Sequence, residues 1–172
     1  MSTLIKLSHE EFKEAVTKRN LIFQLKRRRT FAYYPLPHYK KLIIRFLSAL
    51  MFLPVVGIPA ISYFAHSWIL LLGYVGWYLG IVLAGINNKT SNPIKSFKGL
   101  VLSSGFLLII LVFALGFINA ITFIFFCYMY EFITASLNDI LTTDFIKRSL
   151  LKSKTDYDLA VENEHIKTFL KK

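Results

Sequence analysis

Charged residues are missing from two long stretches of this sequence. Residues 46–88 (43 residues) and residues 99–130 (32 residues) contain no Asp, Glu, Lys or Arg. A transmembrane helix needs about 20 mainly apolar residues to cross about 30 Å of hydrocarbon. The first stretch would be about 65 Å long as one helix, so it must cross twice. A soluble domain of 172 residues could not bury this much apolar surface, which predicts an integral membrane protein.

Reactive side chains are also scarce. Cys127 is the single cysteine, so the chain cannot form an internal disulfide. The four histidines are scattered without ligand spacing, which argues against a metal site. The sequence has no HExxH motif, no glycine-rich phosphate loop and no Ser/His/Asp set at motif spacing. We therefore expect a protein that is not an enzyme and that holds no metal or cofactor.

Basic residues lie at the ends of the uncharged stretches and predict how the chain is threaded. Cytoplasmic segments are enriched in Lys and Arg close to helix ends. Such residues stand in three segments: Lys40, Lys41 and Arg45; Lys89, Lys95 and Lys98; and Lys147, Arg148, Lys152 and Lys154. The turns inside the stretches, near 65–67 and 116–119, carry none.

An all-α protein with four transmembrane helices in two hairpins fits this charge pattern. We place the helices near 42–64, 68–86, 99–116 and 120–137. Both termini and the 87–98 loop then lie in the cytoplasm, and a bacterial inner membrane is the expected location. Two alternatives concern the second stretch, which could cross once as a long tilted helix or could enter the bilayer and return.

Two polar segments flank the predicted membrane domain of residues 42–137. Residues 1–41 contain a capping box, with Ser8 as N-cap and Glu11 at the third helical position, followed by a predicted basic amphipathic helix from about 9 to 29. An aromatic linker with two prolines follows that helix. Residues 138–172 form a polar tail in which residues 155–158 resemble a second capping box.

Small residues recur four apart on the second predicted helix, at Gly76, Gly80 and Ala84, with Gly73 one turn earlier. Such a series lets another helix backbone approach closely, either inside the chain or in a partner. Pro54 and Pro59 interrupt the first predicted helix, and each removes a backbone hydrogen bond.

Charges at the edges of the spans are candidates for function. Glu131 is a possible ion-coupling residue, because an ionisable group in a bilayer is retained only where something offsets its cost. Arg45 is predicted to be an interfacial anchor or a partner of Glu131. Contact with anionic lipids is expected from the basic residues before the first span, without nucleic-acid binding. They are Lys26, Arg27, Arg28, Arg29, Lys40, Lys41 and Arg45.

These features favour a small multipass protein that acts by protein–protein interaction within the bilayer. An accessory subunit, an immunity or inhibitor factor and a membrane-shaping protein all fit this description. The expected partner is a membrane protein or a second copy of the chain, engaged through the glycine series. The alternative is a small oligomeric transporter or channel for an ion or small solute that uses Glu131.

Overall fold

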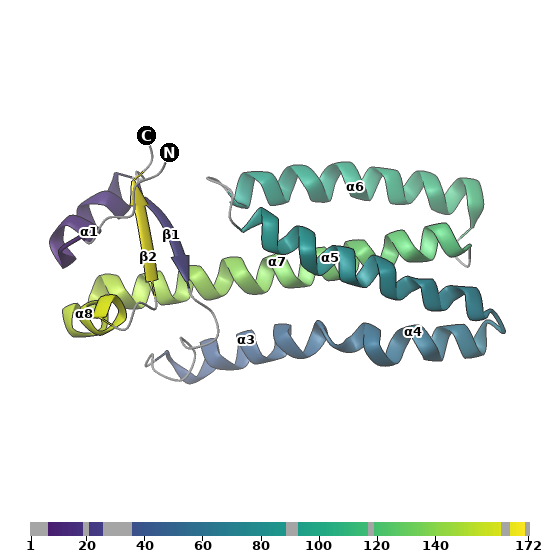
Figure 1. The fold of residues 1–172 in the computed structure, drawn as a ribbon, viewed down its shortest axis with the longest axis horizontal. Helices are drawn as coiled ribbons and strands as arrows, with labels where there is room; N and C mark the ends of the chain where they lie inside the picture. Colours follow the sequence, from purple (N-terminus) through teal and green to yellow (C-terminus); the bar gives the residue numbers. More distant parts are fainter. Residues whose placement is uncertain are drawn as a thin grey trace. The chain divides into compact units, whose positions relative to one another are not determined.

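The computed structural model describes residues 7–18, 21–25, 36–88, 93–116, 119–162 and 166–170. The chain divides into two compact units, which we describe separately (Figure 1). The helical unit comprises Leu42–Ile140. The terminal unit comprises Met1–Lys41 and Leu141–Lys172, so it combines both ends of the chain.

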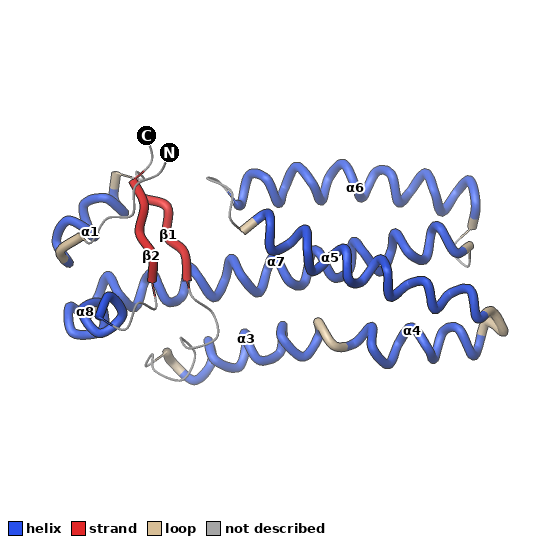
Figure 2. Tube along the Cα trace, viewed as in Figure 1, coloured by secondary structure: helices blue, strands red, loops and turns tan. Residues whose placement is uncertain are grey.

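The helical unit is built from α-helices and one 3-10 helix (Figures 1 and 2). Its elements in chain order are α3 (His38–Leu50), α4 (Leu53–Phe64), η1 (Trp68–Leu72), α5 (Gly73–Asn87), α6 (Pro93–Leu115) and α7 (Ala120–Lys152). Helices α3 and α7 each continue into the terminal unit.

Four segments of this fold are long and apolar enough to cross a membrane, as the sequence predicts. They are His38–Phe64, Trp68–Asn87, Pro93–Leu115 and Ala120–Lys152. The first and third begin earlier than expected, and the last continues 15 residues past the predicted boundary at 137. The orientation of these helices in a bilayer stays a prediction.

The turns lie where the charge-free stretches were expected to reverse. His66, exposed and with φ 49°, stands between α4 and η1. Gly116, with φ 80°, follows α6, and the Asn119 side chain accepts a hydrogen bond from the Ile121 amide (2.9 Å) at the start of α7. The left-handed Gly116 ends α6 and the Asn119 side chain caps the start of α7. The second stretch therefore forms two helices. The alternative of a single long helix is wrong.

The terminal unit begins with α1 (His9–Thr17), which has the predicted capping box. The Glu11 amide donates to Ser8 Oγ (3.3 Å), and the Ser8 amide donates to the Glu11 carboxylate (2.7 Å). The hydrogen bonds of Ser8 lower the pKa of that carboxyl group. The predicted extension of this helix to residue 29 is wrong, because α1 ends at Thr17.

A two-stranded antiparallel ribbon follows α1 and joins the two ends of the sequence. Strand β1 (Leu21–Leu25) pairs with β2 (Ile166–Leu170), with Leu21 opposite Leu170 and Leu25 opposite Ile166. The segment Leu-Ile-Phe-Gln-Leu of β1 is rich in residues that favour strands, but its partner lies more than 140 residues away. An all-α fold class therefore holds for the helical unit but misses this ribbon.

The C-terminal part of the terminal unit contains the end of α7 and α8 (Lys154–Glu162). Helix α8 is capped by Ser153, whose Oγ accepts from the Asp156 amide (3.2 Å), two residues before Thr155, the cap that the sequence suggests. The buried side chains of the terminal unit include Phe12 of α1, Ile146 and Leu150 of α7, and Tyr157 of α8. The predicted short tail helices are thus α8 and the last part of α7.

Candidate functional site

The glycine series of α5 packs against the backbone of α7. A Cβ atom added at Gly76 would lie 1.9 Å from the Ile124 carbonyl oxygen, and one added at Gly80 would lie 2.7 Å from the Tyr128 carbonyl oxygen. Gly73, Gly76, Gly80 and Ala84 are all buried. This is the close helix–helix approach that small residues four apart permit. Of the two expected alternatives, the structure thus shows the series packed inside the chain, against α7.

Two apolar clusters lie along this contact. One contains Ile58, Leu70, Phe123 and Cys127, whose thiol is free and buried. The other contains Ala84, Phe132 and Ala135. The first cluster lies before Glu131 along α7 and the second lies after it, and both hold α5 and α7 in contact.

The first span is interrupted, but the break precedes the prolines. Helix α3 ends at Leu50, α4 begins at Leu53, and Pro54 stands in the first turn of α4, where its missing N–H is tolerated. Pro59 lies inside α4 and leaves the Val55 carbonyl without its usual helical donor. In a bilayer a freed carbonyl must be hydrogen-bonded by a neighbour, since water is absent.

Aromatic side chains of α5 and α7 supply those hydrogen bonds. The Tyr74 hydroxyl donates to Val55 O (2.8 Å), and the Tyr130 hydroxyl donates to Leu50 O (3.0 Å). The indole N–H of Trp77 donates to Met51 O (3.2 Å). Leu50 and Val55 are the residues four positions before the two prolines, so each hydroxyl replaces a donor that proline lacks. The break is thus a fixed bend, held by three side chains.

Glu131 lies on α7 at the centre of this arrangement. Its exposed fraction is 0%, and neither of its carboxyl oxygens has a hydrogen-bond partner. The Trp77 side chain is the polar neighbour that interacts with it, but the indole N–H donates its hydrogen bond to Met51 O. Arg45 is exposed on α3 and does not pair with Glu131. Helix α7 continues to Lys152, well beyond Glu131, and the position of Glu131 relative to the membrane edge stays a prediction.

Further polar side chains follow Glu131 along α7, and we call them the polar row: Thr134, Ser136, Asn138 and Asp139. Thr134, Ser136 and Asp139 are buried. The Asn138 amide donates to Ser48 Oγ (3.3 Å), and the Asn88 side chain donates to the Asp139 carboxylate. The Asn87 amide donates to Pro93 O (3.3 Å) beside this end of the row. Polar groups from three helices thus gather on one side of Glu131.

Sequence reasoning missed the polar row. It ended the fourth helix at 137 and so placed Asn138 and Asp139 in a solvated tail. The spacing 131, 134, 138 matches one helix face and was the available signal.

Helix α6 differs from the other helices of this unit. None of its 23 residues is buried. A groove of about 530 Å³ separates it from α5 and α7, lined by leucines, aromatics and two serines: Leu79, Leu83, Ser103, Ser104, Leu107, Ile121, Ile124, Phe125 and Tyr128. Ser103 Oγ donates only to carbonyls of its own helix, those of Gly99 (3.0 Å) and Leu100 (3.2 Å).

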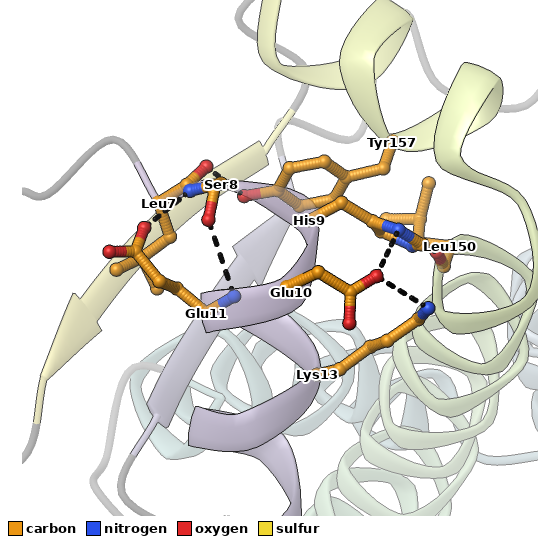
Figure 3. Close-up of polar contacts among 8 residues, drawn as sticks. All are labelled: Leu7, Ser8, His9, Glu10, Glu11, Lys13, Leu150 and Tyr157. Carbon is orange, nitrogen blue, oxygen red and sulfur yellow. Dashed lines mark hydrogen bonds and ion pairs between the residues drawn. The ribbon is translucent and has the colours of Figure 1, made fainter.

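In the terminal unit, polar contacts link α1 to the ends of α7 and α8 (Figure 3). His9 is buried, and its Nε2 hydrogen-bonds to Leu150 O (2.9 Å) near the end of α7. The Tyr157 hydroxyl donates to Leu7 O (2.8 Å), and burial raises the pKa of Tyr157 to about 12. Glu10 contacts both His9 Nδ1 (3.8 Å) and Lys13 Nζ (3.0 Å). These contacts fix α1 against the ends of α7 and α8.

The basic residues expected at the lipid surface are only partly described. Lys26, Arg27, Arg28 and Arg29 lie outside the described residues. Lys40 is half-buried, with its Nζ 4.8 Å from the centre of the Phe145 ring, and Lys41 is half-buried as well. Their contact with anionic lipids stays a prediction.

Among the described residues, no group of three or more His, Cys, Asp or Glu side chains could hold a metal ion. Comparison with protein-family models, curated proteins and solved structures gives no match. The candidate site is therefore defined by its own geometry, as the α5–α7 contact with Glu131 and the bare surface of α6.

Proposed function

We propose that this is a multipass membrane protein that acts by helix–helix association within the bilayer, with α6 as the associating surface. One observation carries the proposal: α6 is long enough to cross the membrane, yet none of its residues is buried. Lipid tails are as apolar as leucine, so close packing holds membrane helices together. A spanning helix without a buried residue leaves surface that can pack against another chain.

The surface chemistry of α6 supports the same role. Gly99 and Ser103 are exposed and four apart, and a Cβ added at Gly99 or Gly105 would meet no atom within 4 Å. Small residues at this spacing allow close approach of a second helix. The partner is a second copy of the chain or another membrane protein. Two hairpins with both termini cytoplasmic, and a role other than catalysis, belong to this proposal.

Cysteine crosslinking in native membranes tests it. Cys127 is buried and the only cysteine, so Cys127→Ser gives a background for single cysteines. On α6 they replace Leu102 (75% exposed) and Phe113 (87%), and the matched controls replace Val56 (74%) and Phe64 (80%) on α4. Oxidation should yield dimers from α6 positions only.

If the partner is a different membrane protein, a second crosslinking experiment is needed to detect it. A photo-crosslinking residue at the same four positions should then capture a defined membrane protein from α6 but not from α4. If neither chemistry separates α6 from α4, α6 faces lipid and the proposal fails.

Transport of an ion or small solute is a second candidate function, favoured by the burial of Glu131. It predicts a flux in liposomes that carry the purified protein. Glu131→Gln should abolish this flux, whereas Asp144→Asn, on the part of α7 outside the helical unit, should retain it. Absence of flux, or flux that ignores Glu131→Gln, would remove this candidate.

A further inference from the structure

Glu131 is a fully buried carboxyl group of α7 that lies beside Gly80 of α5 and has no counter-charge. We infer that it is a proton-binding site inside the membrane, which holds its proton in the folded helical unit and exchanges it through the polar row of α7. This inference is independent of association through α6. It holds whether or not the protein carries a solute.

The state of the carboxyl group follows from its surroundings. Both oxygens lack a hydrogen-bond partner, and the side chain is fully buried. Burying an isolated carboxylate is far more costly than burying the neutral acid, so such a group takes up a proton. A close approach encloses it: a Cβ at Gly80 would lie 2.7 Å from Glu131 Cβ.

The neighbouring elements supply no compensating positive charge. The titratable side chains within about one turn of Glu131 on α7 are Cys127, Tyr128 and Tyr130, and those on α5 are Tyr74 and Tyr78; none of them carries a positive charge. The basic side chains Arg45 on α3 and Lys95 and Lys98 on α6 are exposed. Since the carboxyl oxygens have no partner, none of these groups forms an ion pair with Glu131.

A proton fits this site better than a metal cation. Hard cations are held by several oxygen ligands at once, about six to eight for calcium. The backbone oxygens near the bend, those of Leu50, Met51 and Val55, already accept hydrogen bonds from aromatic side chains. A proton needs only one oxygen, which Glu131 itself provides.

The site is polar on one side and apolar on the other. Toward the start of α7 lies the apolar cluster of Ile58, Leu70, Phe123 and Cys127.

Toward the end of α7, Thr134 is one turn away from Glu131 and donates to carbonyls of its own helix. Asn138 and Asp139 follow, with Asp139 about 12 Å along the helix at about 1.5 Å per residue. Asn138 Oδ1 is buried without a hydrogen-bond partner. It can accept a hydrogen bond from a water molecule or from the group that carries the proton. Exchange therefore proceeds through the polar row.

Infrared spectroscopy of the full chain in lipid vesicles tests the site. In neutral buffer free glutamates are ionised, because their pKa is about 4.3. We expect a protonated-carboxyl stretching band that is lost in Glu131→Gln and kept in the matched control Asp139→Asn. No such band in the unmodified protein, or a band lost in Asp139→Asn instead, would overturn the inference.

Isotope labelling keeps the test independent of variants. Carbon-13 in the glutamate carboxyls should shift the band of the unmodified protein, whereas carbon-13 in the aspartate carboxyls should not. A shift with labelled aspartate alone assigns the proton to an aspartate and overturns the inference.

Exchange with heavy water tests the route. Asn138→Leu should slow the isotopic shift of the Glu131 band about tenfold or more, as a barrier raised by about 1.4 kcal/mol would. The control Ser103→Ala on α6 should leave the exchange rate unchanged. Equal rates in both variants would show that the proton takes another path.

Discussion

Helices α5 and α6 are both apolar, both contain glycines and both qualify as membrane spans, yet they pack in opposite ways. Helix α5 buries Gly73, Gly76, Gly80, Ala84 and Asn87, whereas α6 buries no residue. The aromatic donors of α5 bind carbonyls of α4 and of the turn between α3 and α4, whereas Ser103 of α6 bonds to its own helix. Apolar character therefore places a helix in the bilayer, and spacing of small residues together with cross-helix donors decides whether it packs within the chain.

Gly76→Ala should have the largest effect on this contrast. The added methyl group would meet the Ile124 carbonyl oxygen at 1.9 Å, and a backbone oxygen can move only if the helices separate. We expect a loss of about 3 kcal/mol or more in the free energy of unfolding. The measurement is unfolding in mixed micelles followed by tryptophan fluorescence.

Gly105→Ala on α6 is the matched control, since its added methyl group meets no atom within 4 Å. It should leave the free energy of unfolding unchanged or slightly higher. Similar losses in both variants would mean that α5 and α6 do not differ in packing.

Tyr74→Phe should have the next largest effect, because it removes the donor to Val55 O. Cross-helix hydrogen bonds in membrane proteins contribute about 0.6 kcal/mol on average and up to about 1.7 kcal/mol. We expect a loss of about 1 kcal/mol, since the alternative donor is missing at Pro59.

A double-mutant cycle isolates that hydrogen bond. In Pro59→Ala the restored amide can donate to Val55 O, so Tyr74→Phe in that background should cost little. The two substitutions should therefore couple by about 1 kcal/mol. Strict additivity would contradict the assignment of Tyr74 as the replacement donor.

The parts of the fold that depend on local sequence could be predicted, and those that depend on distant partners could not. The four spans followed from the uncharged stretches, and the turns at His66 and Gly116 from their positions inside them. Strand β1 was missed because its partner β2 comes from the other end of the chain. The burial of Glu131 could not be predicted, because it depends on the close approach of Gly80 on α5, which is about 50 residues away in the sequence.

The glycine series shows the same limit at the level of the site. Its spacing predicts close helix approach, and the approach is observed. Which helix makes it is not encoded in the spacing, so the sequence left both an internal contact and a partner contact open. The three aromatic donors were likewise beyond prediction, because each pairs with a carbonyl at least 19 positions away.

Gly85→Ala should separate the packed face of α5 from the helix as a whole. Gly85 lies one residue after Ala84, but nothing lies within 4 Å of its added Cβ. Alanine in a helix interior is favoured over glycine by roughly 0.5–1 kcal/mol, so the free energy of unfolding should rise by up to that amount. A marked loss of stability would show that α5 is packed on more than one face.

Ser103→Ala should have the smallest effect on the isolated chain. Its hydroxyl is exposed and bonds only to its own helix, and surface substitutions of this kind usually stay within about 0.5 kcal/mol. Ser103→Leu should likewise spare unfolding but lower the yield of crosslinked dimer from α6 cysteines, because the bulky side chain blocks close approach at Gly99 and Ser103. A loss of chain stability with unchanged crosslinking would place Ser103 in the internal packing, and would remove the contrast between α5 and α6 at this position.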